Sequence, residues 1–233
     1  MTAPSLSRPA RAASAPPSAA RPTPARPRPP RELLRTGDLQ LLTWLAEQYA
    51  ASGDQLQPLL GCGSRTVQRT LARLRAHGLI ETSRLLADQP LWITPTARGL
   101  RACGSGFGTW RPRVGLLAHV AAVNEVRLHV QGRDPDAEWV SERQLAKQRQ
   151  DAREHLPDGV VITGGRSVAV EVELTLKSRR RVEAILDQLT AHYEATVYFC
   201  AAGPQRLLDE LAASARWPTL GVRALLTSSK VPS

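Results

Sequence analysis

Three carboxylates, Asp158, Glu171 and Glu173, have a spacing that would let them share one metal site. Hard divalent cations prefer oxygen ligands, and phosphodiester-cleaving centres use such cations to activate water and to offset phosphate charge. The three acids therefore predict a Mg2+ cofactor and a metal-dependent DNA nuclease. A solvated sheet face, or an inherited fold without activity, is the alternative explanation of the same residues.

A strand–turn–strand hairpin must position these acids. Residues 160–163 form an apolar run, and Gly164-Gly165 signals a tight turn from which a second strand, residues 167–177, folds back. Because side chains alternate along a strand, the two glutamates and Lys177 are expected on one face. Asp158 begins the partner strand, so the hairpin should bring all three carboxylates to one end of a sheet.

The elements around the hairpin predict an α+β fold. A long amphipathic helix, residues 113–130, precedes the hairpin and carries Glu125 as a fourth acid. His119 and His155 are weaker candidates for acid–base or phosphate-contacting roles. The remaining elements are expected to be a strand at 138–141, a polar segment at 142–153, a helix at 178–193, a strand at 195–200, a helix at 205–215 and a strand at 220–226. This order predicts a mixed sheet flanked by helices.

That element order, together with Pro157-Asp158 and Glu171-Val-Glu173, resembles the PD-(D/E)xK restriction-endonuclease-like fold. The resemblance implies that Asp158 and Glu171 bind a metal ion and that Glu125 is the helical acid that assists them. Glu173 stands where the water-activating lysine of the family is expected. Lys177 is roughly 13 Å further along an extended strand, so it can replace that lysine only if its side chain reaches back or the strand bends.

The front of the chain predicts a second module. Helical spacing follows residue 36, a short helix is expected at 55–60 and a third at 65–77, and residues 79–84 and 91–94 read as a pair of strands. Residues 64–81 and 93–99 resemble the recognition helix and wing of bacterial winged helix-turn-helix proteins. The resemblance implies major-groove or phosphate contacts from the cationic helix face and the wing, namely from Arg65, Gln68, Arg69, Arg73 and Arg84. A solvated arginine face used for protein contacts is the alternative.

Charge supports a polyanionic partner. The net charge is +10, and residues 1–30 contribute five arginines, nine of the eighteen prolines and no acid. This tail is expected to be disordered, because it has too little apolar surface to offset its ordering entropy. Arg179, Arg180 and Arg181 could hold a DNA backbone beside the acids. Without an apolar stretch long enough to span a bilayer, a cytoplasmic protein with no membrane partner is expected.

We expect four parts in the chain: a Pro/Arg-rich tail at 1–30, a winged helix-turn-helix domain at 31–103, a glycine-rich hinge at 104–112 and a nuclease-like domain at 113–233. Cys62, Cys103 and Cys200 are too few and too widely spaced to predict a disulfide framework or a zinc ribbon.

From residue 36 to about residue 200 the chain resembles the replication-relaxation family of actinobacterial plasmids and mobile elements. The resemblance depends on the front module, residues 119–127, Pro157-Asp158-Gly159 and Glu171-Val-Glu173. It implies a DNA-binding protein involved in replication, relaxation or mobilisation, with double-stranded DNA as partner. A replication initiator, a relaxase and a second copy of the chain are further candidate partners. The alternative is a transcription or copy-number regulator whose C-terminal domain serves only dimerisation or partner binding.

Overall fold

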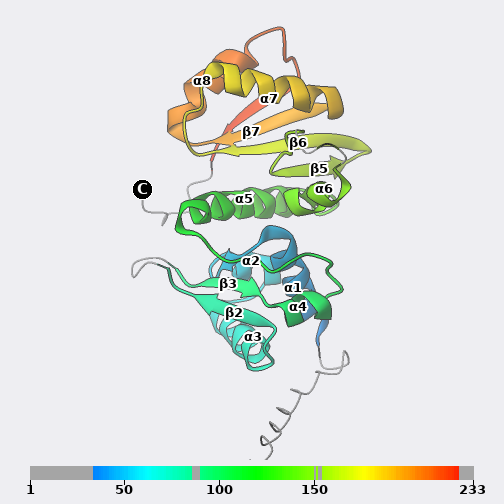
Figure 1. Cartoon of the computed structure of the whole chain (residues 1–233), viewed down its shortest axis with the longest axis vertical. Helices are drawn as coiled ribbons and strands as arrows, with labels where there is room; N and C mark the ends of the chain where they lie inside the picture. Colours follow the sequence, from blue (N-terminus) through cyan, green and yellow to red (C-terminus); the bar gives the residue numbers. More distant parts are fainter. Residues whose placement is uncertain (1–33, 86–89, 150, 152–153, 226–233) are drawn as a thin grey trace, which may run out of the picture.

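The computed structural model describes residues 34–85, 90–149, 151 and 154–225 and has an α+β fold with two sheets. The predicted tail, the tip of the predicted wing at 86–89 and residue 226 of the last predicted strand lie outside the described residues. Figure 1 shows the N-terminal elements at one end, the five-stranded sheet toward the other, and helix α5 between them. No helix of the described part of the chain is long and apolar enough to cross a membrane.

The N-terminal unit consists of α1 (Thr36–Gln48), β1 (Ala51–Ser52), α2 (Leu56–Leu60), α3 (Ser64–Ala76), β2 (Ile80–Ser83), β3 (Trp92–Pro95) and α4 (Ala97–Ala102). Its three strands are antiparallel in the order β1-β3-β2. The helical spacing of α1 and α3 produces the core, because Leu41 and Leu45 pack with Val67, Leu71 and Leu74. The opposite side of α3 is therefore left polar and exposed.

A close approach fixes α4 against the start of β2. A Cβ atom on Gly99 would lie 2.0 Å from the carbonyl oxygen of Leu79, so this position excludes any larger residue. Thr96 caps α4: its hydroxyl accepts a hydrogen bond from the Gly99 N–H and donates one of 2.7 Å to the Gly78 carbonyl. The loop after α3 is thereby tied to the beginning of α4.

The C-terminal unit consists of α5 (Val114–Arg133), β4 (Glu138–Ser141), α6 (Glu142–Gln148), β5 (Gly159–Thr163), β6 (Arg166–Glu173), α7 (Arg179–His192), β7 (Ala195–Cys200), α8 (Ala202–Ala212) and β8 (Leu220–Ala224). The sheet has the order β4-β5-β6-β7-β8. The pairs β4–β5 and β5–β6 are antiparallel, and the pairs β6–β7 and β7–β8 are parallel. This is the predicted mixed sheet.

Helices cover both faces of this sheet. Val123 and Val126 of α5 pack on one face against Val170 and Val172 of β6. The helices α7 and α8 cover the other face, where Ile185 contacts Ala169. In Figure 1 the sheet accordingly lies between α5 and the α7–α8 pair. The two glutamates of β6 are therefore buried. This excludes the alternative in which they lie on a solvated face of the sheet.

One local prediction was wrong, and three elements were not predicted. Strand β6 ends at Glu173, so Lys177 is not on the strand. Helix α6 forms within the segment that was predicted only to be polar, because Ser141 and Gln144 make a capping box at its start. Strand β1 and helix α4 were not predicted.

Helix α5 joins the two units through buried polar contacts. Asn124 has no exposed surface, and its amide donates to the carbonyl of Ala50 at 2.8 Å and to Gln55 Oε1 at 3.0 Å. Arg127 pairs with Glu47 of α1 at 2.8 Å. Because Asn124, Gln55 and Arg127 are buried, separating the units would leave polar atoms without partners.

The glycine-rich segment 104–112 is held by Arg143 of α6. The guanidinium group donates to the carbonyl of Gly108 at 2.6 Å and to that of Ala46 at 2.7 Å. It also lies over the rings of Tyr49 and Phe107, at 4.7 and 4.6 Å from their centroids. The segment predicted to be a hinge is thus fastened to both units in this conformation.

Candidate functional site

A cavity of about 470 Å³ lies where β6 ends, between α5, α6 and α7. Asp158, Glu171 and Lys177 of the predicted catalytic set line it, and so do both histidines that were weaker candidates. Its lining also includes residues that were not predicted, among them Glu142, Arg149 and Gln188. The cavity therefore combines several carboxylates with several cationic or titratable side chains.

Asp158 is held by two different partners. Its Oδ2 atom accepts a hydrogen bond of 2.7 Å from the backbone N–H of Val172, and its Oδ1 atom lies 2.8 Å from His119 Nε2. Burial opposes the charged form of His119, but the hydrogen bond and the negative charge of Asp158 outweigh it, so the pKa of His119 is raised. A histidine oriented by a carboxylate in this way can exchange a proton with a bound group.

Glu171 forms a second histidine–carboxylate pair in the same cavity. Its Oε1 atom lies 2.9 Å from His155 Nε2, and only 4% of the residue is exposed. Burial and, to a smaller extent, the charge of Asp158 raise the pKa of Glu171 to about 7 against the opposing effect of His155. The backbone N–H of His155 donates to Gln188 of α7, which fixes the approach of this histidine.

Glu173 does not line the cavity, although it was predicted beside Glu171. It is buried, and its Oε2 atom lies 2.5 Å from Lys177 Nζ. The strand ends at Glu173 and the chain turns before α7, so the lysine side chain reaches back over four residues. This satisfies the condition under which Lys177 could supply the missing amine, and Lys177 also lines the cavity.

Glu125 does not join the other acids, which corrects the predicted metal-ligand set. It accepts a hydrogen bond of 2.9 Å from Gln55 of the N-terminal unit. His119 and Glu125 are six residues apart on α5, which places their side chains about 120° apart around the helix. Since His119 points toward Asp158, the helix directs Glu125 elsewhere.

Tyr49 connects the N-terminal unit to this site. Its hydroxyl donates to Glu142 Oε2 at 3.2 Å, and its backbone has φ of 70°, in the left-handed region. Burial and the charge of Asp158 raise the pKa of Glu142, and burial together with the charge of Glu142 raises the pKa of Tyr49 to about 12. Glu142 was not predicted, because its sequence neighbours are polar and no pattern distinguishes it.

The carboxylates as placed do not fit a magnesium ion. Asp158 and Glu171 are paired with histidines, and Glu173 is paired with a lysine. Among the described residues, no three or more His, Cys, Asp and Glu side chains are grouped so that they could hold a metal ion. Magnesium binding would require these side chains to exchange partners, and it stays a prediction.

Three of the predicted DNA-contacting residues lie on one exposed face. Arg65, Gln68 and Arg69 are exposed on α3, opposite its buried apolar side. Arg73 differs, because its guanidinium group forms two hydrogen bonds with the buried Asp38 of α1, one of them 2.6 Å long. Arg84 is exposed just after β2. The structure therefore gives Arg73 a role in holding α3 on α1.

The three arginines at the start of α7 have different surroundings. Arg179 pairs with Glu210 of α8 at 2.5 Å. Arg180 is exposed, and Arg181 is exposed and lines the cavity. Ser178 caps the helix by accepting a hydrogen bond from the Arg181 N–H. Only Arg181 of the three is thus placed beside the acids.

Comparisons with known proteins place the chain in a family. No curated protein matches it. Among solved structures, the one described as PigF with SAH matches with 14% identity and a TM-score of 0.22 over 84% of this chain, which is too low a score to carry an argument. The chain spans 64% of the length of that protein. The family model described as Replication-relaxation matches residues 42–203, well over half of the 233 residues. The chain therefore belongs to the replication-relaxation family.

Proposed function

We propose that this protein binds duplex DNA of a plasmid or mobile element through a winged helix-turn-helix formed by its N-terminal unit. Family membership supports a role in replication or relaxation. The observation that carries the DNA-binding proposal is the outer face of α3, where Arg65, Gln68 and Arg69 are exposed and no acid intervenes. A helix with such a face can enter the major groove, where arginine and glutamine contact base edges and phosphates.

The C-terminal cavity is proposed to hold a phosphate group of the bound DNA. Its lining includes three cations, Lys177, Arg149 and Arg181. The two histidines are each hydrogen-bonded to a carboxylate. Cationic side chains favour phosphate oxygens, and a histidine paired with a carboxylate can donate or accept a proton at the phosphate. Nicking of DNA is the reaction that this arrangement would serve, with or without the predicted magnesium ion.

Duplex binding is tested by comparing charge removal on α3 with charge removal elsewhere. Arg65→Ala/Arg69→Ala should weaken binding to a labelled blunt duplex by about tenfold or more, because each lost phosphate or base contact contributes about 1–3 kcal/mol. Arg133→Ala/Arg166→Ala removes the same charge from exposed positions of the C-terminal unit and is the matched control. Equal binding by wild type and the α3 variant would refute the assignment of this face.

Nicking is tested separately with supercoiled plasmid and magnesium or manganese. Wild type should convert the plasmid to the open circle, and Asp158→Ala and Glu171→Ala should each abolish the conversion. Isothermal titration with Mg2+ alone reports metal binding independently of activity. Duplex binding without nicking under any metal would favour the regulator alternative, in which the C-terminal unit serves dimerisation or partner contacts.

A further inference from the structure

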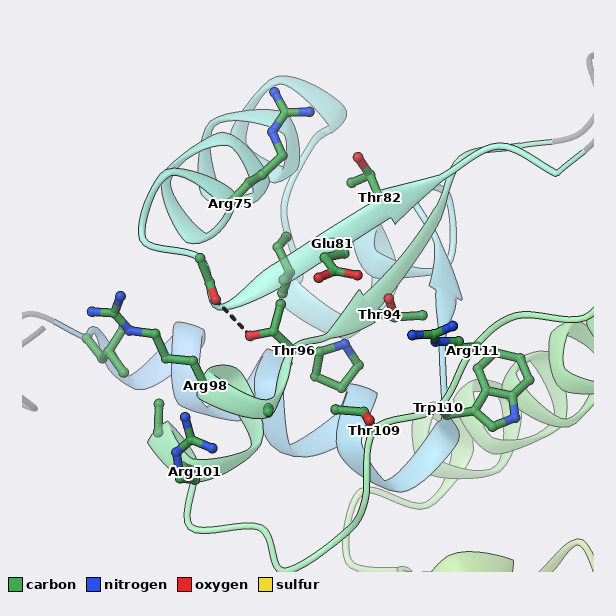
Figure 2. Close-up of a pocket in the computed structure, with 16 residues that line it drawn as sticks. Arg75, Glu81, Thr82, Thr94, Thr96, Arg98, Arg101, Thr109, Trp110 and Arg111 are labelled. Carbon is green, nitrogen blue, oxygen red and sulfur yellow. Dashed lines mark hydrogen bonds between the residues drawn. The ribbon is translucent and has the colours of Figure 1, made fainter. Parts of the chain in front are cut away.

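A second cationic surface lies on the N-terminal unit and meets the exposed face of α3 at the C-terminal end of that helix, where Arg75 lies. A groove of about 1510 Å³ runs between the end of α3, the β2–β3 pair, α4 and residues 109–111. Small-molecule pockets usually measure about 300–1,000 Å³, so the groove is larger than a compact ligand needs. Figure 2 shows its floor of β2 and β3 between Arg75 above and Arg98, Arg101 and the Trp110–Arg111 segment around it.

The charge of the groove is strongly positive. Arg75, Arg98, Arg101 and Arg111 line it, against one acid, Glu81. Arg75, Arg101 and Arg111 are exposed, and none of the three makes an ion pair within the described part of the chain. Some arginines elsewhere are neutralised by carboxylates, as Arg73, Arg127, Arg179 and Arg216 are. Several arginines without a carboxylate partner around one groove favour the binding of a polyanion there.

The groove also offers hydroxyl groups and one aromatic surface. Thr82 and Thr94 of the sheet and Thr109 line its floor and rim. Trp110 lines one end, half-buried, with its ring tilted against Tyr49 at a centroid distance of 5.4 Å. Tyr49 covers part of the indole and supports it, so that the remaining surface can receive a flat ring. A cationic groove with an aromatic stacking surface is the combination that binds a single nucleic-acid strand.

We infer that this groove binds single-stranded DNA, with phosphates on Arg75, Arg101 and Arg111 and a base stacked on Trp110. The inference rests on the proposed function in one respect: duplex on α3 and a single strand in the groove would be parts of the same DNA. A protein holding both would favour a junction between paired and unpaired DNA. Sequence-independent binding is expected, because arginine–phosphate contacts and stacking carry little base information.

The test measures fluorescence anisotropy of three labelled DNAs: a single strand of about 15 nucleotides, its blunt duplex, and the duplex with a single-stranded tail. The groove variant is Arg101→Gln/Arg111→Gln, and the control Arg133→Gln/Arg166→Gln removes two exposed charges outside the groove. Thermal unfolding of both variants is compared with wild type before binding is measured.

The groove variant should bind the single strand at least tenfold more weakly than wild type, and its binding should depend less on salt. Each phosphate contact contributes about 0.7 to the slope of log affinity against log salt for a single strand, so losing two lowers the slope by about 1.4. Trp110→Leu should weaken single-strand binding by about tenfold without changing that slope, because stacking releases no counterion. Blunt-duplex binding should stay within twofold of wild type in both variants.

Other outcomes overturn the inference. Equal loss of single-strand and blunt-duplex binding would assign the groove to the duplex surface, and unchanged single-strand binding would leave it without this ligand. If the groove variant loses binding to poly-glutamate but binds the single strand as wild type does, the groove is assigned to an acidic protein segment. If wild type binds the single strand in the groove but no blunt duplex, the duplex proposal fails and this inference stands.

Discussion

Replacing Glu171 by glutamine tests the electrostatics of the cavity directly. The buried carboxyl has a pKa raised from 4.5 to about 7, so its neutral form is favoured in the folded protein. Each unit of pKa shift corresponds to 1.36 kcal/mol, and the shift is therefore equivalent to about 3 kcal/mol. The stability that the neutral carboxyl provides is fully present below pH 4.5 and is lost as the pH rises through about 7.

Glutamine stays neutral at every pH and keeps nearly the same shape, so it lacks this loss. The unfolding free energy of Glu171→Gln minus that of wild type should therefore increase by up to about 3 kcal/mol between pH 4.5 and pH 8. Urea denaturation at several pH values measures both free energies. Glu138→Gln, at an exposed position of β4, is the control for the same chemical change.

A difference that stays constant within about 1 kcal/mol over this range would refute the reasoning. It would mean that burial does not disfavour the charged form of Glu171, or that a partner stabilises that form fully. The absolute offset at pH 4.5 reports something else, namely how well the glutamine amide replaces the carboxyl group as hydrogen-bond partner of His155.

Two further predictions concern the contacts that fix the helices. Asp38→Asn should lower the unfolding free energy by about 2 kcal/mol, a value discounted because Arg73 is partly exposed. Burial alone would raise the pKa of Asp38, but the interactions with Arg73 and Arg35 together outweigh it and lower that pKa. Wild type should therefore lose its advantage over the variant as the pH falls below 3.8, which urea denaturation can follow. Arg143→Ala should leave the carbonyls of Ala46 and Gly108 without their donors and destabilise the segment around Gly108 by about 2 kcal/mol. Amide hydrogen exchange in that segment should become faster. Unchanged exchange would contradict the role of Arg143 in fastening the segment.

Local patterns predicted much of the sheet and little of the cavity. Alternation predicted β6, because a half-apolar strand leaves a period-two signal in sequence, and a short apolar run before the Gly164-Gly165 turn predicted β5. They also predicted that Asp158 and Glu171 meet at one end of the hairpin, where both line the cavity. The rotation of α5 could not be predicted, since it depends on packing against both units, and it brought His119 to Asp158 in place of Glu125.

Residues that enter the cavity from distant parts of the chain left no signal. Glu142 begins a helix in a polar stretch, and Tyr49 ends a helix of the other unit. Their hydrogen bond joins residues 93 positions apart, so no periodicity of either segment encodes it. The pairing of Arg73 with Asp38 was missed for the same reason, because an arginine on an amphipathic helix reads as exposed until its neighbour is known.

The contact between Tyr49 and Glu142 is a route by which a ligand in the cavity would be coupled to the N-terminal unit. Tyr49 ends α1, supports Trp110 and donates to a carboxylate beside Asp158. A cavity ligand that displaces Glu142 from Tyr49 would release the tyrosine ring, and with it the ring contact that holds Trp110 at the groove. Such a coupling is reciprocal: whatever factor a cavity ligand imposes on the affinity of the groove, a groove ligand imposes on the affinity of the cavity.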